Sequence, residues 1–333
     1  MKQRHYVLLC LLNMMASIGH AQKTNLDYAE SLRRPNLNRY NDAISLTAPD
    51  KVLDISTDGL TDNSGEANFK LGQSYEERAK NQPEQAIIWY RKALQAYAAA
   101  GQSNHAGALN NLGTLYEKNR GVETSKVNTQ SHTKELAAAY YRRSAKLGNA
   151  EAQYNLGRLL IREPSIAEST DEWQMWLETA ANQGLIEAQV KLGQQQQMLA
   201  NSEYGTPEAR NRLRETSTKW LRKAAMLGNP DGEFYYAVAL QKGWGTQRDL
   251  AGSVAWFERA SAQNHGLAQL ELGRCYAWGL GVTSSNEKAL EYFMLAQANG
   301  IDQSKTLIHE LRTSMSLRNT STVNHSFKKS SKK

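Results

Sequence analysis

The sequence predicts an all-α fold, a solenoid of about six helix pairs followed by one closing helix. The first observation is a recurring motif that ends in Leu-Gly, as in Ala-Gln-Tyr-Asn-Leu-Gly at 152–157. The small residue that opens the motif recurs at Ala67, Ala108, Ala152, Ala188, Gly232, Ala268 and Ser304. These positions are 41, 44, 36, 44, 36 and 36 residues apart. A period in this range is typical of repeat arrays.

A second column of residues lies between the copies of this motif and has the same period. Its aromatic positions are Tyr140, Trp176, Trp220, Trp256 and Tyr292. Each is followed four positions later by a small residue, which places both on one helical face. Four positions further on stands Gly or Asn, which adopts the left-handed conformation that ends a helix. Each repeat is therefore predicted to be two helices with a tight corner, in which the aromatic residue fills the space above the small residues.

The N-terminus has the pattern of a secretory signal peptide. Lys2 and Arg4 precede an apolar run at 7–15, and Gly19 and Ala21 are small residues at the third-last and last positions before a cleavage site. The run is too short to span a bilayer. We expect cleavage after Ala21 and a periplasmic or secreted protein. A buried first helix is the alternative.

The segments on either side of the array differ from it in composition. Residues 22–64 match neither column and are predicted to form a mostly flexible arm. Residues 317–333 are rich in Ser, Thr, Asn and Lys, have five cations and no acid, and are predicted to be a disordered basic tail. The formal net charge of the chain is +7. Because the leader and the tail hold this excess, the array itself is close to neutral, which argues against a nucleic-acid-binding face.

The array is predicted to cover residues 65–316. Its six helix pairs are 66–80 with 83–101, 106–118 with 134–147, 150–162 with 171–183, 186–200 with a helix ending at 227, 230–242 with 250–263, and 267–278 with 287–299. The closing helix is predicted at 303–315. All six prolines of the chain fall outside the predicted helix interiors, which agrees with this division.

The two columns, together with the glycine-containing corners at 243–245 and 279–281, resemble the Sel1-like repeat, a relative of the tetratricopeptide repeat. The resemblance covers roughly residues 65–315. It implies a right-handed α-solenoid and a role as an adaptor or regulatory scaffold. A cysteine-rich secreted branch of this family, linked to β-lactam binding or hydrolysis, has a disulfide in each repeat. The mature chain would keep only Cys275, so that activity is not expected.

No pattern of residues in the sequence predicts catalysis. The chain has no His-Glu-x-x-His, Gly-x-Ser-x-Gly, phosphate-binding loop or Cys-x-x-Cys. The histidines that would remain after cleavage are scattered without the spacing of metal ligands: His105, His132, His265, His309 and His325. We therefore expect a protein that is not an enzyme and that holds no metal or cofactor.

The sequence points instead to a binding surface. In tetratricopeptide relatives the residue after the Leu-Gly pair tends to face the groove of the solenoid. In this chain these residues are Gln73, Thr114, Arg158, Gln194, Val238 and Arg274. This row is polar and has two arginines and no acid, so it could bind acidic side chains or a chain terminus of a partner. The alternative is an ordinary solvated face.

Two tryptophans lie at or beside the glycine-containing corners, Trp244 and Trp278. An exposed tryptophan in such a place is an anchor for a partner, whereas one that packs against the next repeat is part of the core.

Two functions follow from the features of the predicted binding surface. The first is a scaffold that binds protein partners in the cell envelope or after secretion. The second is binding of peptidoglycan or an exported polysaccharide in the groove, which a row of exposed aromatic residues would favour. Neither a nucleic acid nor a membrane span is predicted.

Overall fold

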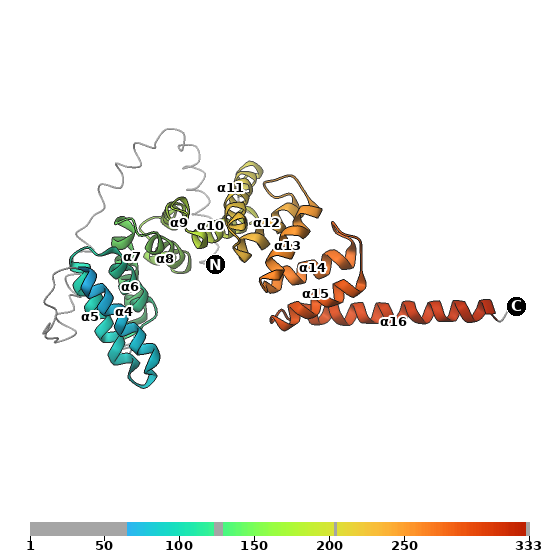
Figure 1. The fold of residues 1–333 in the computed structure, drawn as a ribbon. Helices are drawn as coiled ribbons and strands as arrows, with labels where there is room; N and C mark the ends of the chain where they lie inside the picture. Colours follow the sequence, from blue (N-terminus) through green and yellow to red (C-terminus); the bar gives the residue numbers. More distant parts are fainter. Residues whose placement is uncertain (1–64, 123–128, 203–204, 331–333) are drawn as a thin grey trace. The chain divides into compact units, whose positions relative to one another are not determined.

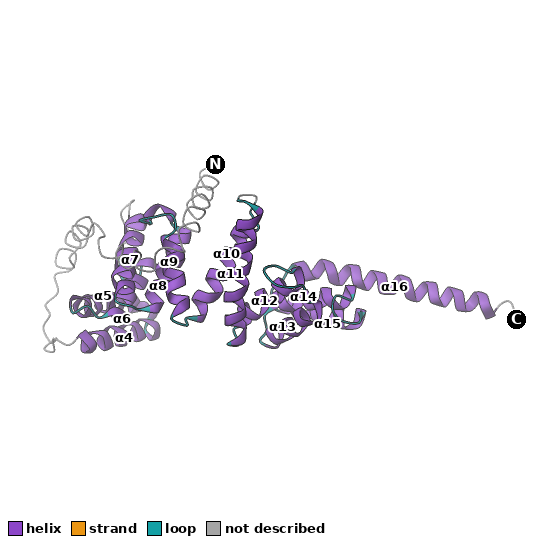
Figure 2. Ribbon diagram, turned by 90° about the horizontal axis from the view of Figure 1, so that it is seen from above, coloured by secondary structure: helices purple, strands orange, loops and turns teal. Residues whose placement is uncertain are grey.

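The computed structural model describes residues 65–122, 129–202 and 205–330. In these residues the chain forms thirteen α-helices and two short 3-10 helices, and it has no strand (Figure 1, Figure 2). The all-α repeat solenoid predicted from the two columns is therefore confirmed. The predicted leader and the predicted arm lie outside the described residues.

The helices belong to two compact units, Met1–Ala188 and Gln189–Lys333, and α10 (Ile186–Ala200) spans the division. The described helices of unit 1 are α4 (Gly65–Asn81), α5 (Ala86–Gln102), α6 (Ala106–Glu117), α7 (Thr129–Lys146), α8 (Ala150–Arg162) and α9 (Glu172–Asn182). Those of unit 2 are α11 (Pro207–Met226), α12 (Pro230–Lys242), α13 (Leu250–Ala262), α14 (Gly266–Trp278), α15 (Asn286–Ala298) and α16 (Gln303–Ser330). The 3-10 helices are η2 (Pro83–Gln85) and η3 (Pro164–Ile166), both in unit 1.

The helix bounds agree with the predicted pairs to within one residue at most ends, and three helices have both predicted bounds: α8, α10 and α12. The predicted start of α7 at 134 is wrong, because this helix begins at Thr129. The polar composition of residues 129–133 predicts a loop, but these residues include neither glycine nor proline and so can continue a helix.

The end of the array also differs from the prediction. Helix α16 runs from Gln303 to Ser330, so its predicted end at 315 is wrong, and residues 317–330 are helical where the sequence predicts a disordered tail. The segment from 303 to 330 has no glycine and no proline, so no residue in it favours a helix end. The start of α16 is anchored, since Ile308 is buried in the core of unit 2.

The glycines of the Leu-Gly motif make room for a large side chain of the second helix in the pair. A Cβ atom at Gly113 would lie 2.6 Å from the ring of Tyr141. The prediction that the aromatic column fills this space is wrong, because the residue after it does so. These residues are Tyr141, Leu177, Leu221, Phe257 and Phe293, and all are buried. Adjacent residues of a helix point about 100° apart, so only one of the two can face the first helix. Of the aromatic column, Tyr140 and Trp176 are buried beside these residues, whereas Trp220, Trp256 and Tyr292 are only partly buried.

Residues with a positive φ end the second helices of the repeats, and side-chain caps begin several of the helices that follow. The residues predicted to end the second helices, Gly148, Gly184, Gly228, Asn264 and Gly300, all have a positive φ. Four of the helices that follow such a corner are capped by a side chain that accepts a hydrogen bond from the backbone N–H three residues later. The capping residues of α6, α8, α12 and α14 are His105, Asn149, Asn229 and His265. These N–H groups belong to the small residues that open the Leu-Gly motif, so cap and motif form together.

The histidine caps have a second hydrogen bond. The Nδ1 atom of His265 accepts from the N–H of Ala268 at 3.1 Å, so its Nε2 bears the proton and donates to the carboxylate of Asp231, also at 3.1 Å. This hydrogen bond lowers the pKa of Asp231. Because Asp231 belongs to α12, the ring links the starts of two successive repeats. His105 joins α6 to Glu66 of α4 in the same way.

A buried ion pair joins α7 and α9 in unit 1. Arg142 donates from Nε to one carboxylate oxygen of Glu172 at 2.7 Å and from Nη2 to the other at 2.8 Å. Each of these side chains is only 5% exposed. The Nη2 atom also donates to the carbonyl oxygen of Ile166, and the indole N–H of Trp176 donates to Glu172. The bidentate geometry fixes how the two helices lie against each other.

Candidate partner-binding site

The structure divides the predicted site residues between the two units. Gln73, Thr114 and Arg158 lie in unit 1, whereas Gln194, Trp244, Arg274 and Trp278 lie in unit 2. Gln73 is exposed and Gln194 is half-buried. The hydroxyl of Thr114 donates to the carbonyl oxygen of Asn110 at 3.2 Å. Of the row residues, only the two arginines are charged.

Arg158 is bound to its own chain. Its Nη2 atom donates to both carboxylate oxygens of Glu117, at 2.9 and 2.8 Å. Arg162 and the hydroxyl of Tyr141 donate to the same carboxylate, at 2.6 and 2.8 Å. The side chain of Glu117 is 6% exposed and that of Arg158 is 29% exposed. The positive charge of Arg158 is therefore matched within unit 1, and this arginine joins α8 to α6.

The Glu117 cluster is expected to make the free energy of unfolding depend on pH. Burial alone would raise the pKa of Glu117, but Arg158, Tyr141 and Arg162 together hold it below its usual value. A carboxylate with a lowered pKa stabilises the fold above the pKa of the unfolded chain, and this contribution is lost as the pH falls through the folded-state pKa. We expect Glu117→Gln to lower the free energy of unfolding by about 2 kcal/mol at pH 7. Urea titrations should show this difference shrinking below about pH 4. A difference that stays constant down to pH 3 would contradict the prediction.

The two corner tryptophans have different surroundings. Trp244 is half-buried, and its carbonyl oxygen accepts a hydrogen bond from the Thr218 hydroxyl of α11 at 2.7 Å. The guanidinium carbon of Arg214, also on α11, lies 5.8 Å from the centre of its ring. Trp278 is 59% exposed at the end of α14. Trp244 thus packs against a neighbouring helix, whereas Trp278 is accessible to a partner.

Trp278 and Arg274 line a common hollow on unit 2, which we call the Trp278 hollow. Its volume is about 480 Å³. The lining residues are Gln241, Lys242, Arg248, Leu250, Glu271, Arg274, Trp278 and Leu280. They come from the first residue of α13, from the end of α12, from α14 and from the corners that follow α12 and α14. Gly243 and Gly279 end these helices in the left-handed conformation, with φ of 70° and 68°, and so turn both corners toward the hollow.

The Trp278 hollow contains three cations and one carboxylate. Arg274 pairs with Glu271 one turn before it on α14. The Nε atom of Arg248 donates to the carbonyl oxygen of Gln241 at 3.1 Å. Among the described residues, no carboxylate pairs with Arg248 or with Lys242. The hollow can therefore bind an anionic group beside an apolar or aromatic group that packs on Trp278.

Lys242 and Arg248 are not among the site residues that the sequence predicts. Lys242 stands in its repeat where Trp278 stands in the next one, thirty-six residues later. That correspondence could have placed the two side chains at equivalent helix ends. It could not have shown that the two helix ends share a hollow, because this depends on how successive repeats stack.

Two further kinds of site, a metal centre and a reactive thiol, are not found among the described residues. They contain no group of three or more His, Cys, Asp or Glu side chains that could hold a metal ion. Cys275 is buried, and burial raises the pKa of its thiol to about 11, so it is present as the unreactive thiol. Among the described helices, none is both long and apolar enough to cross a membrane.

Comparisons with known proteins identify the repeat. The family model of the Sel1 repeat matches six segments: 65–96, 106–149, 150–165, 186–229, 230–265 and 266–300. No curated protein matches the chain. A Sel1 repeat protein from Oxalobacter formigenes is similar in structure, with a TM-score of 0.55 and 24% identity, covering 70% of this chain and 86% of that one.

Two further solved structures are less similar. A putative Sel1 repeat protein from Klebsiella pneumoniae has 16% identity and a TM-score of 0.34, covering 72% of this chain and 99% of that one. A protective antigen of uropathogenic Escherichia coli has 19% identity and a TM-score of 0.35, covering 76% of this chain and 73% of that one.

Proposed function

Because the chain belongs to the Sel1 repeat family, we propose that it is a non-catalytic scaffold that binds a protein partner in the cell envelope or after secretion, as an adaptor or regulator. Sel1 repeats generally mediate protein interactions. The predicted signal peptide, with cleavage after Ala21, supports the location. The Trp278 hollow supports the binding role.

The exposure of Trp278 is the observation that carries the proposal. A tryptophan side chain that is 59% exposed beside cationic groups is typical of an anchor position in protein interfaces. Lys242 and Arg248 have no carboxylate partner among the described residues. We expect the partner to place a carboxylate near these two cations and an apolar or aromatic side chain on the indole ring.

The test is an affinity capture from an envelope extract with the mature chain as bait. The test variant combines Arg274→Ala with Trp278→Ala. The control variant combines Arg312→Ala with Met294→Ala, which also removes an arginine and a large exposed side chain of unit 2 but lies outside the hollow. The proposal predicts a protein that the wild type and the control recover and that the test variant loses. Equal recovery by both variants, or no recovered protein, would contradict it.

Glycan binding is the alternative, and the same indole ring favours it. An exposed tryptophan can pack against a sugar ring while Lys242 and Arg248 donate hydrogen bonds to hydroxyl groups. Co-sedimentation of the mature chain with insoluble peptidoglycan separates the two functions. Sedimentation that Trp278→Ala abolishes, together with no captured protein, would replace the scaffold proposal with glycan binding.

A further inference from the structure

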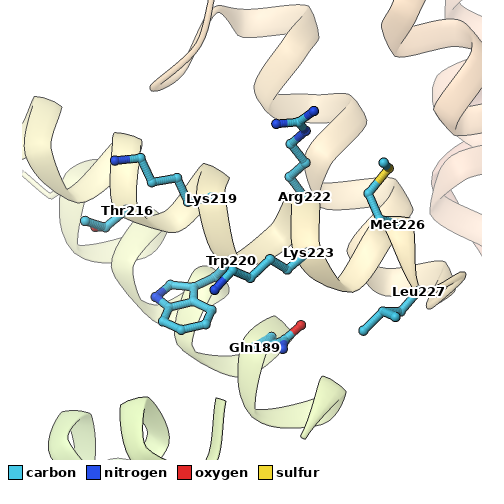
Figure 3. A pocket seen from close by; sticks show the side chains of 8 residues that line it. All are labelled: Gln189, Thr216, Lys219, Trp220, Arg222, Lys223, Met226 and Leu227. Carbon is cyan, nitrogen blue, oxygen red and sulfur yellow. The ribbon is translucent and has the colours of Figure 1, made fainter. Parts of the chain in front are cut away.

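Unit 2 has a second hollow, which shares no residue with the Trp278 hollow. It lies along α11 and has a volume of about 710 Å³. Figure 3 shows the side chains that line it: Gln189, Thr216, Lys219, Trp220, Arg222, Lys223, Met226 and Leu227. All but Gln189 belong to α11 or directly follow it. We call the surface formed by Lys219, Trp220, Arg222, Lys223, Met226 and Leu227 the α11 face.

One end of the α11 face is apolar. Met226 is 63% exposed and Leu227 is 60% exposed, and the two are adjacent at the end of the helix. Trp220 is partly buried and lies in the same hollow. Single exposed apolar residues are common on protein surfaces, but several that line one hollow indicate an interaction site.

The other part of the α11 face is cationic. Lys219, Arg222 and Lys223 are exposed, and within the described ranges no carboxylate pairs with any of them. The Nζ atom of Lys223 lies 4.2 Å from the centre of the Trp220 ring, so its charge is held over the aromatic face. Helix α11 as a whole has six basic and two acidic residues. In an array that is close to neutral, this is a local concentration of positive charge.

The spacing of these residues places cations and apolar side chains at opposite ends of the α11 face. Lys219, Arg222 or Lys223, and Met226 follow the i, i+3 or i+4, i+7 pattern and so lie along one side of the helix over about 10 Å. Cations occupy the N-terminal part of this stripe, and apolar side chains occupy its C-terminal end. A ligand that matches the stripe must have acidic groups at one end and apolar groups at the other, which is a property of a short peptide segment.

We propose that the α11 face binds an acidic, amphipathic segment of a partner protein, about two helical turns in length, with its carboxylates on Lys219 and Arg222 and its apolar side chains on Met226 and Leu227. The proposal rests on the scaffold function above and names a second surface and the class of its partner. The positive charge of the α11 face favours an acidic segment over a neutral one through charge complementarity. The apolar end decides against a nucleic acid, whose backbone would leave Met226 and Leu227 without a partner.

The test is a selection from a display library of random sixteen-residue peptides against the mature chain. The test variant is Lys219→Glu with Arg222→Glu. The matched control is Arg210→Glu with Arg212→Glu, which makes the same charge change on α11 outside the hollow. We expect enriched peptides that combine Asp or Glu with large apolar residues. Fluorescence anisotropy should show their Kd rising about tenfold or more with the test variant and changing little with the control.

The remaining outcomes overturn the inference and separate it from the scaffold proposal. No enriched peptide, or peptides that bind the test variant as well as the wild type, would overturn it. Acidic peptides that lose binding only with Arg274→Ala and Trp278→Ala would support the Trp278 hollow and overturn the α11 face. The last experiment measures binding of the mature chain to vesicles of phosphatidylglycerol. Binding to them that the test variant loses, with no enriched peptide, would assign the face to a membrane surface instead.

Discussion

Replacing Arg142 with methionine is expected to lower the free energy of unfolding by about 3 kcal/mol or more, because the buried carboxylate of Glu172 would lose its counter-charge. Both side chains are 5% exposed, so water cannot take the place of the guanidinium group without opening the packing of α7 against α9. The N–H groups of Trp176 and Glu168 would still donate to Glu172 but bring no positive charge. Urea-induced unfolding followed by circular dichroism measures the change.

A double variant separates the lost charge from lost packing. In Arg142→Met with Glu172→Leu both charges are gone, so the cost of an unpaired buried charge disappears. Well-packed apolar residues often replace a buried ion pair with little loss of stability. We therefore expect the double variant to be more stable than Arg142→Met by at least about 1 kcal/mol. A double variant that is less stable than the single one would show that the two substitutions act through packing alone.

Gly157→Val is expected to lower the free energy of unfolding by about 2 kcal/mol or more, through overpacking between α8 and α9. A Cβ atom at this position would lie 2.7 Å from the Cγ of Leu177 and 2.9 Å from the carbonyl oxygen of Trp173. Leu177 is fully buried, and the carbonyl belongs to helix backbone, so neither can move away without shifting the helix.

The control for this prediction is Met198→Val on α10, where the side chain is 58% exposed. It introduces the same β-branched residue into a helix without a close contact, and we expect a change below about 0.5 kcal/mol. Because valine is a better helix former than glycine, helix propensity cannot account for a loss of stability in Gly157→Val. Equal effects of the two substitutions in urea melts would show no penalty for overpacking at Gly157 and would contradict the packing argument.

The sequence predicted the repeats well because their ends depend on local chemistry. Residues such as Gly228 and Asn264 stop a helix through their own backbone conformation, and the motif glycines follow from close helix contact. The end of α16 was not predicted, since the segment after 315 has neither a stop signal nor a helix-like apolar pattern. Composition alone suggested disorder there.

The candidate sites were only partly predictable. Trp278 and Arg274 were identified from their places in the repeat, and the structure brings them into one hollow. The pairing of Arg158 with Glu117 was missed, because it joins residues 41 apart in sequence and depends on how far one helix is rotated against the next. The α11 face was missed for a different reason: its residues are close in sequence, but which side of α11 is exposed depends on how this helix packs against its neighbours.

The histidine caps have a consequence for how the array opens. In repeat proteins a terminal repeat can detach while its neighbours stay folded, because each repeat contacts only the next one. The ring of His265 is bonded at once to the start of α14 and to Asp231 at the start of α12, so the first turn of α14 cannot fray without releasing that carboxylate as well. We therefore expect neighbouring repeats joined in this way to exchange their amide protons as one cooperative block larger than a single repeat.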